Sequence, residues 1–208
     1  HLFKSRPPLN NFMYVFGNGE SRTSIDIDKL NGPKIGCNAI HRDYHMDHLV
    51  CVDRRMAQEA VDANLKHTQI YTRKDWISWF PQGVTTVPDL PYEGKQRWDE
   101  PFQWGSGPYA VLLSVTLYND RTAHLIGFDL HSTTTTVNNV YKGTSNYDKA
   151  DKRPVDPRYW IHQIGMVFNC FPNTQFKILV KDNWTLPKAW TQPNVKVDNI
   201  STLLYNKI

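Results

Sequence analysis

The strand-like segments of the sequence are separated by helical or polar stretches, and this alternation constrains the fold more than any other feature. Residues 34–40 and 48–53 are apolar almost throughout, which is typical of strands covered on both faces. The other expected strands are residues 12–16, 69–73, 122–130 and 175–180, with a weak one at 195–197. Parallel neighbours need crossover connections. The pattern therefore predicts an α/β fold, a three-layer sandwich around a mainly parallel sheet.

Helical spacing of apolar residues predicts the crossovers. The clearest helix is residues 54–65, in which Met56, Ala60 and Leu65 recur on one face. Ser106 is a plausible N-cap of a second helix. The expected helices are residues 54–65, 106–118 and 159–171, a short one at 76–80 capped by Asp75, and one after the first strand. Long irregular loops are expected at 81–103 and 131–157.

The length of 208 residues fits one domain. We expect an N-terminal extension (1–11), a core (12–180) and a C-terminal arm (181–208). Three cysteines, an odd number within apolar runs, favour buried thiols in a reducing compartment such as cytoplasm. The sequence has no membrane-length apolar run, so no membrane partner is expected. The net charge is +4, but the basic residues are distributed along the chain and interspersed with acidic ones, which argues against nucleic-acid binding.

The first strand runs directly into Gly17-Asn18-Gly19. In an α/β sheet this turn lies at the carboxyl edge, where glycines let a ligand approach the backbone and helix N–H groups attract phosphate. A glycine turn that only connects a strand to a helix gives the same tripeptide. Other strand ends and helix starts reach the same edge with Asn38, Asp53, Ser106, Gly107, Asp129 and His131.

Four short blocks occur in a particular order: 15–21, Cys37-Asn38, 105–107 followed by Ala110, and 125–129. Together they resemble bacterial sialyltransferases with a single Rossmann-like domain, over about residues 13–131, and the chain is also similar to uncharacterised phage proteins. The resemblance implies a Rossmann-like sheet and a nucleotide-sugar-dependent, glycosyltransferase-like protein, probably phage-encoded by our expectation. The nucleotide-sugar would be its substrate, and no separate cofactor or metal is expected.

The resemblance also implies which residues bind the donor. They are Gly17, Asn18, Gly19, Ser21, Asn38, Ser106 and Gly107, with Gly127 and Asp129 near the base or ribose and Tyr141 and Tyr147 over the phosphate. From the residues themselves we add Asp53, which ends a strand, and Arg22, whose charge offsets phosphate, as do Arg42 and Lys142. The alternatives are that the asparagines cap their own turns, the tyrosines pack a loop and the cations lie on the surface.

His131 is the expected catalytic base, because imidazole titrates near neutrality. The family places its His-Ser dipeptide near the end of a long loop, whereas His131-Ser132 follows the strand directly. A loop histidine without a role is the alternative.

A second function class therefore stays open: a non-catalytic Rossmann-like virion or assembly protein, whose Trp-rich tail contacts other virion proteins or a second copy. The expected location is the cytoplasm of an infected bacterium, or the virion.

The histidines at positions 41, 45 and 48 offer a different chemistry. On a helix His41, His45 and His48 would share a face near Asp43 or Asp47, a set that binds zinc. The segment separates two strands by only a few residues, however. We therefore favour a short surface turn whose histidines diverge.

Overall fold

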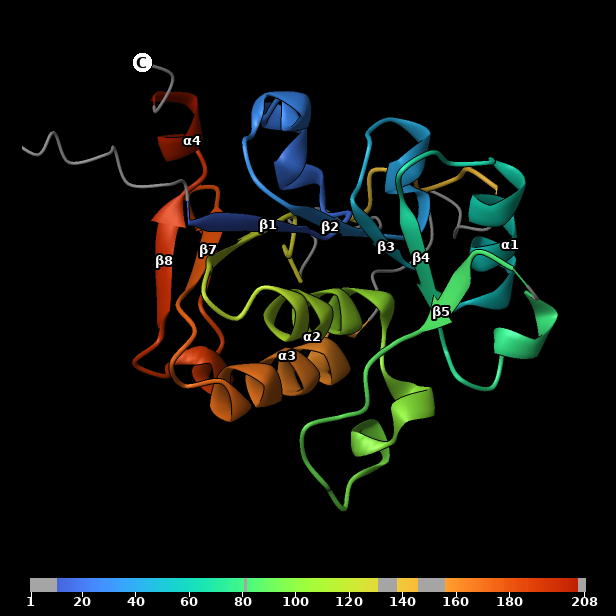
Figure 1. The fold of residues 1–208 in the computed structure, drawn as a ribbon. Helices are drawn as coiled ribbons and strands as arrows, with labels where there is room; N and C mark the ends of the chain where they lie inside the picture. The colour runs from blue at the N-terminus through green and yellow to red at the C-terminus, as the bar shows by residue number, and fades with distance from the viewer. Residues whose placement is uncertain (1–10, 81, 131–137, 146–155, 206–208) are drawn as a thin grey trace, which may run out of the picture.

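In the computed structural model of the protein, eight strands form one sheet, and all seven pairings between neighbours are parallel (Figure 1). The structure describes residues 11–80, 82–130, 138–145 and 156–205. The strands are Phe12–Phe16 (β1), Lys34–Cys37 (β2), His48–Val50 (β3), Gln69–Thr72 (β4), Val84–Thr86 (β5), Thr122–Ile126 (β6), Phe176–Val180 (β7) and Val195–Asn199 (β8). The predicted α/β fold with a parallel sheet is confirmed.

The sheet is doubly wound, because its strand order β5-β4-β3-β2-β1-β6-β7-β8 reverses between β1 and β6. Crossovers between parallel strands are right-handed, so connections that step in opposite directions lie on opposite faces. Ser106–Leu117 (α2) and Arg158–Cys170 (α3) cover one face, and Arg54–Asp62 (α1) covers the other (Figure 1). The result is the expected three-layer sandwich.

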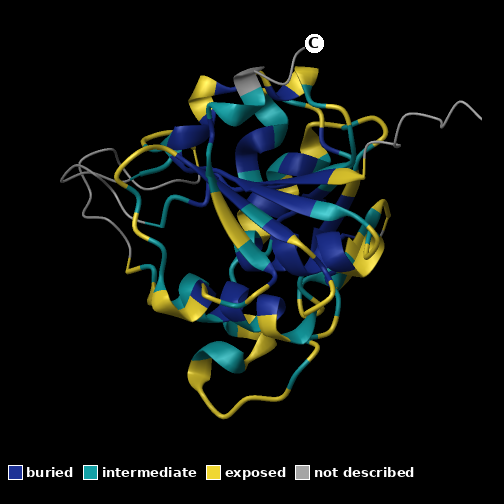
Figure 2. Ribbon diagram, turned by 90° about the vertical axis from the view of Figure 1, so that its left-hand side faces the viewer, coloured by how far each residue is buried: buried dark blue, intermediate teal, exposed yellow. Residues whose placement is uncertain are grey.

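The residues of β1 show why the central strands are apolar throughout. Met13 and Val15 pack in the cluster that contains α2 and α3, whereas Tyr14 and Phe16 pack in the cluster that contains α1. Successive side chains of a strand point to opposite faces, so a strand covered on both faces needs apolar residues at every position. Figure 2 shows the central strands as a buried layer, whereas the edge strands β5 and β8 carry exposed and partly exposed residues.

The prediction of a helix after the first strand is wrong. Two 3-10 turns, Glu20–Ser24 (η1) and Ile27–Lys29 (η2), make that connection instead. The backbone is extended at Ile25 (φ −114°, ψ 141°) and at Asp26 (φ −85°, ψ 98°), which ends η1 and prevents one continuous helix. The strand expected at 34–40 also ends early, at Cys37, and Asn38–Arg42 (η3) follows as a 3-10 turn.

Smaller differences lie in the predicted loops and termini of elements. β5 forms within the expected irregular region, at the sheet edge. The expected helix at 76–80 is one 3-10 turn, Ile77–Trp79 (η4), and Asp75 does not cap it, because its carboxylate pairs with Arg73. The remaining short elements are Arg97–Asp99 (η5), Pro101–Gln103 (η6), Lys188–Trp190 (η7) and Thr202–Tyr205 (α4).

The C-terminal arm contributes to the core. The strand expected at 195–197 extends over Val195–Asn199 and pairs with β7. Trp190 is fully buried, with its ring 5.5 Å from that of Phe168, and its Nε1 donates to Ile161 O at 2.8 Å. This tryptophan therefore packs inside the domain and offers no exposed surface to another protein. None of the helices in the described ranges combines the length and apolarity that a bilayer crossing requires.

Candidate functional site

A cavity of about 370 Å³ opens at the carboxyl edge, above the ends of β1 and β6, where the strand order reverses. This is the topological switch point of the sheet, the usual ligand site of open α/β folds. Nine of the predicted residues line it: Gly17, Asn18, Gly19, Asn38, Asp53, Ser106, Gly107, Gly127 and Asp129. The order of these residues in the sequence thus located this edge of the sheet.

Two glycines bring the ends of β1 and β6 together beneath the cavity. Gly17 N donates to Ile126 O at 2.8 Å, and Gly19 N donates to Gly127 O at 2.9 Å. A Cβ on Gly17 would lie 2.4 Å from Gly127 O, and one on Gly127 would lie 2.5 Å from Gly17 O. Gly127 also has a φ of +78°, which side chains rarely adopt. Glycine at both positions is what lets the two strand ends approach.

Asp129 presents its carboxylate to the cavity and is held from behind by Ser21. Ser21 N donates to Asp129 Oδ2 at 3.0 Å, and the Ser21 hydroxyl donates to Oδ1. A Cβ on Gly19 would lie 2.5 Å from Asp129 Cγ, so the third glycine position also needs its open space. Ser21 itself does not line the cavity. Its contacts make it a residue that positions Asp129.

The Asn18 side chain is engaged inside the protein. Its Nδ2 donates to Cys37 O at 3.0 Å, and its Oδ1 accepts from Arg22 Nη2 at 3.3 Å. Asn18 thereby links the ends of β1 and β2 instead of capping its own turn, and it also lines the cavity. Burial raises the pKa of the neighbouring Cys37 thiol to about 12, so this cavity-lining cysteine is protonated and is not an activated nucleophile.

Arg22 lies behind the cavity with 2% of its surface exposed. Its guanidinium is 5.5 Å from the ring centroid of Tyr141 and 5.9 Å from that of Tyr44. Arg22 Nη2 also donates to the Tyr141 hydroxyl at 3.1 Å, and that hydroxyl donates to Asp43 Oδ2 at 2.8 Å. Burial raises the pKa of Tyr141 to about 12. Tyr141 and Arg22 thus contact each other and not the cavity directly.

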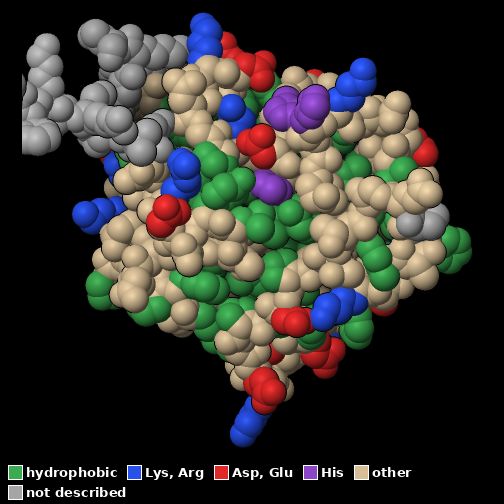
Figure 3. Space-filling model, viewed as in Figure 1, with side chains coloured by type: hydrophobic (Ala, Val, Ile, Leu, Met, Phe, Trp, Pro, Cys, Tyr) green, Lys and Arg blue, Asp and Glu red, His purple; other side chains and the backbone are tan. Residues whose placement is uncertain are grey.

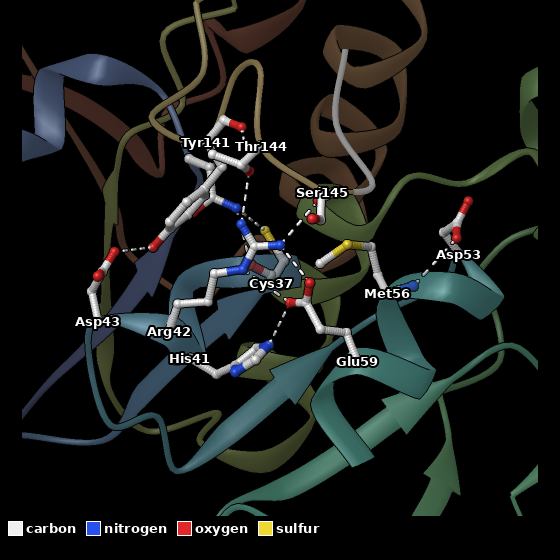
Figure 4. Close-up of polar contacts among 11 residues, drawn as sticks. Cys37, His41, Arg42, Asp43, Asp53, Met56, Glu59, Tyr141, Thr144 and Ser145 are labelled. Atoms are coloured by element: carbon white, nitrogen blue, oxygen red, sulfur yellow. Dashed lines mark hydrogen bonds and ion pairs between the residues drawn. The ribbon is translucent and has the colours of Figure 1, made fainter. Parts of the chain in front are cut away.

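Residues 138–145 form a segment that closes one side of the cavity, which Asn138 and Asn139 line. Val140 N donates to Asn18 O at 2.9 Å, and Glu20 N donates to Asn138 Oδ1 at 2.8 Å. Figure 4 shows Arg42 between this segment and α1: it donates to Thr144 Oγ1 at 2.7 Å and to Ser145 O at 3.0 Å, and it pairs with Glu59. The segment is therefore attached to the domain at both of its ends.

The start of α2 supplies backbone donors to the cavity. Its N-cap is Gly105, not Ser106 as expected, and glycine has no side chain to accept from the first turn. The Ser106 hydroxyl donates to Asn38 Oδ1 at 3.0 Å and accepts from Val52 N at 3.0 Å. Asn38 has a φ of +54°, which turns the chain out of β2 toward this hydroxyl. An N-terminal helix turn without a side-chain cap suits an anionic group.

Asp53 has a defined structural role at the cavity rim. Its Oδ1 accepts from Arg55 N at 2.8 Å and from Met56 N at 3.3 Å, so Asp53 is the N-cap of α1. Figure 4 shows this cap beside Met56. A second oxygen remains on the same carboxylate at the cavity.

Some predicted residues do not reach the cavity, and some cavity residues were missed. His131 and Tyr147 lie outside the described residues. Lys142 pairs with Glu20 at 2.7 Å, and Arg42 pairs with Glu59, so neither of these cations lines the cavity. The missed lining residues are Val52, Met56, Pro108, Phe128, Leu130, Asn138, Asn139, Trp160 and Ile164. The α3 residues could not be found from sequence, because they reach the site only through the packing of α3 on α2.

The three histidines of the metal alternative have separate partners. His41 Nε2 lies 3.1 Å from Glu59 Oε2, and His48 lies between the hydroxyls of Tyr71 and Tyr118 at 3.0 and 2.9 Å. Burial lowers the pKa of His41 and that of His48. Within the described ranges, no three His, Cys, Asp or Glu side chains are placed to hold a metal ion together. On the face shown in Figure 3, basic and acidic side chains are interspersed.

Comparison with known proteins gives one distant structural likeness. No protein-family model matches the chain, and no curated protein matches it. Among solved structures, the chain is similar to the sialyltransferase CST-II, determined in complex with trisaccharide acceptor and CMP, with a TM-score of 0.47 and 12% sequence identity over 80% of each chain. An identity and a TM-score this low do not carry a function from one protein to the other.

Proposed function

We propose that the switch-point cavity binds a nucleotide and that the protein is a nucleotide-sugar-dependent, glycosyltransferase-like enzyme. The observation that supports this most is the cavity itself, which combines the start of α2 with the paired glycines of β1 and β6. Its volume of about 370 Å³ suits a small organic ligand. A phage origin of the protein is part of the same proposal and rests on the sequence resemblance alone.

The charges around the cavity suggest an orientation for the nucleotide. Phosphate fits the start of α2, where backbone N–H groups and the helix dipole favour negative charge. Asp129 and Asp53 repel phosphate but accept hydrogen bonds, so they suit sugar hydroxyls. Phe128, Trp160 and Ile164 supply the apolar surface against which a flat base packs. The ribose would then lie between Asp129 and the α2 start.

Sugar transfer additionally needs a base for the acceptor hydroxyl. We propose His131 for this role, since it follows Leu130, which lines the cavity. The base takes the hydroxyl proton, the acceptor oxygen forms a bond to the anomeric carbon, and the bond from that carbon to the phosphate oxygen breaks. The nucleotide leaves with the negative charge, which the α2 start stabilises. Tyr147 is kept as a proposed phosphate contact, a role that rests on the sequence resemblance alone.

Calorimetric titration with the monophosphates of cytidine, uridine and guanosine tests the nucleotide proposal. We expect at least one of them to bind, and its parent nucleoside to bind about tenfold more weakly or worse, because the α2 contact is lost.

Asp129→Asn keeps an acceptor for Ser21 but removes the charge, and should weaken binding by about tenfold. Asp120→Asn, in the turn before β6 at the opposite end of that strand, is the matched control. Absence of binding by all three at millimolar concentration would refute the proposal.

A further inference from the structure

An exposed aromatic and cationic surface lies beside the cavity, over the start of α1. We define the Trp79 surface as Arg54, Arg55, Gln58, Asp62 and Trp79, which line one shallow hollow together with Glu59. Trp79 belongs to η4 and is 59% exposed, an unusual degree for so large an apolar side chain. Figure 1 shows α1 and the short turn preceding β5 at the same end of the sheet.

A second hollow lies between the Trp79 surface and the cavity. It is lined by Arg54, Arg55, Arg73 and Trp76 and also includes Val52 and Asp53, and both of these residues line the cavity. Arg54 and Arg55 in turn belong to the hollow of the Trp79 surface. The three hollows therefore adjoin one another through shared residues, and a ligand that extends out of the cavity past Asp53 is directed toward Trp79.

Arg54 holds the aromatic residues of this surface in place. Its guanidinium lies 4.2 Å from the ring centroid of Trp79 and 5.8 Å from that of Trp76. Trp76 is fixed further by its Nε1, which donates to Val52 O at 3.0 Å. Among the described residues no carboxylate lies within ion-pair distance of Arg54. Because Arg54 covers one face of the indole, the exposed part of Trp79 lies on its other face and edges.

The polar groups around Trp79 indicate the class of ligand. Arg54, Arg55 and Gln58 carry hydrogen-bond donors, and Asp53 and Asp62 carry acceptors. Gln58 Nε2 already donates to Asp62 Oδ1 at 2.8 Å and Arg55 lies 3.6 Å from Asp53 Oδ1, so a ligand would use the remaining donors and lone pairs of these groups. A sugar ring needs both kinds of partner for its hydroxyls and presents an apolar face of C–H groups to an aromatic ring. A polyanion such as a nucleic acid would use the arginines but would be repelled by the two carboxylates. The mixture therefore favours a saccharide that is neutral or carries one negative charge.

We propose that the Trp79 surface is a saccharide-binding subsite that holds the acceptor of the transfer reaction. One ring stacks on Trp79, and the next sugar extends past Arg55 and Asp53 toward the cavity. This inference deepens the proposed function and rests on it for the identity of the saccharide as acceptor. Binding of the saccharide itself needs no nucleotide, so the two proposals can fail separately.

The test is to titrate the full chain with lactose and with 3′-sialyllactose, without nucleotide, and to follow the indole N–H resonance of Trp79 by NMR. We expect one of these saccharides to shift that resonance at millimolar concentration. Trp79→Ala should weaken binding by about tenfold or more, and Arg54→Lys should weaken it as well, because lysine keeps the charge but not the planar stack. Both side chains are exposed, so the variants are expected to fold.

Phe102→Ala is the matched control. Phe102 is 53% exposed and also lies beneath an arginine, with Arg73 at 5.2 Å, but it does not line either hollow of the path to the cavity. Saccharide affinity should therefore be unchanged in Phe102→Ala. An equal loss in both variants would overturn the inference, as would salt-dependent binding of oligothymidylate without saccharide binding. If nucleotides bind and neither saccharide shifts Trp79, the subsite is refuted and the nucleotide proposal stands.

Discussion

His124 is buried within β6, and neither of its ring nitrogens has a hydrogen-bond partner among the described residues. Its ring centroid lies 4.5 Å from that of Phe12 and 5.3 Å from that of Tyr14. Burial lowers the pKa of His124 from 6.5 to about 4. The unfolded chain therefore takes up this proton at a higher pH than the folded one, so the free energy of unfolding falls as the pH decreases from 6.5 toward 4.

Replacing this histidine should reduce the acid sensitivity of the fold. We expect His124→Phe to remove up to about 3 kcal/mol of the stability difference between pH 7 and pH 4. Urea unfolding at a series of pH values measures it. His45→Gln, at an exposed histidine outside the core, is the control for removing a histidine as such. An unchanged slope in His124→Phe would show that other groups cause the acid sensitivity.

The contact between Gly17 and Gly127 can be separated from the backbone conformation that Gly127 adopts. Gly127 and Gly83 have nearly equal φ values, +78° and +76°, but a Cβ on Gly83 would meet no atom within 4 Å. Gly83→Ala should therefore lower the free energy of unfolding by only about 1 to 2 kcal/mol, the cost of holding alanine in the left-handed conformation. Gly127→Ala should cost clearly more, because its Cβ would also displace β1. Thermal unfolding compares them, and equal losses would contradict the steric role of Gly127.

At the scale of elements, Tyr141 is one of the residues that attach the 138–145 segment to the domain. The Tyr141 hydroxyl accepts from Arg22 and donates to Asp43, so Tyr141→Phe leaves a buried guanidinium and a carboxylate each with one partner fewer. We expect the free energy needed to open the segment locally to fall by about 1 to 3 kcal/mol. The readout is hydrogen exchange of the Val140 amide, which is bonded to Asn18 O.

Tyr44 provides the control for this change. Arg22 also lies over the ring of Tyr44, at 5.9 Å, but the structure gives its hydroxyl no hydrogen bond to any described residue. Tyr44→Phe should therefore leave exchange of the Val140 amide unchanged. If both variants accelerate exchange equally, packing of the rings and not the Tyr141 hydroxyl attaches the segment.

The predictable elements were those that local sequence determines. α1 follows from the helical spacing of its apolar residues, and the central strands follow from runs such as Leu49 to Val52. α2 was located by its long apolar run, but it is buried on all sides from Pro108 to Val115 and has no single apolar face, and Leu117, expected on such a face, is exposed. The connection after β1 was mispredicted because Ile25 and Asp26 adopt extended conformations, which divide it into two short 3-10 turns, and apolar spacing does not reveal such a break. β5 was missed because a three-residue edge strand is stabilised by pairing with β4 and not by its own pattern.

For the whole molecule, sequence order sufficed to locate the candidate site but not to complete it. Parallel strands end at a common edge, so Asn18, Asn38 and Asp129 were expected together, and all three line the cavity. Which side chains contact one another there depends on distances that sequence does not contain. Ser21 holds Asp129 from behind, and Arg22 lies beneath the cavity, although both were expected to touch a ligand. Trp160 was missed for the same reason, because it reaches the cavity only through the packing of α3 on α2.

The reversal of strand order has a consequence for how the chain is made. Phe12 pairs with Thr122 and Phe16 with Ile126, so β1 cannot acquire this neighbour until β6 has left the ribosome. In the meantime β2 to β5 can assemble on one side of β1, while its other edge and the side chains awaiting α2, such as Met13 and Val15, stay uncovered. An open strand edge with apolar side chains is a template for pairing with other chains. The place where the two halves of the sheet meet is therefore also where a nascent chain is most exposed to aggregation.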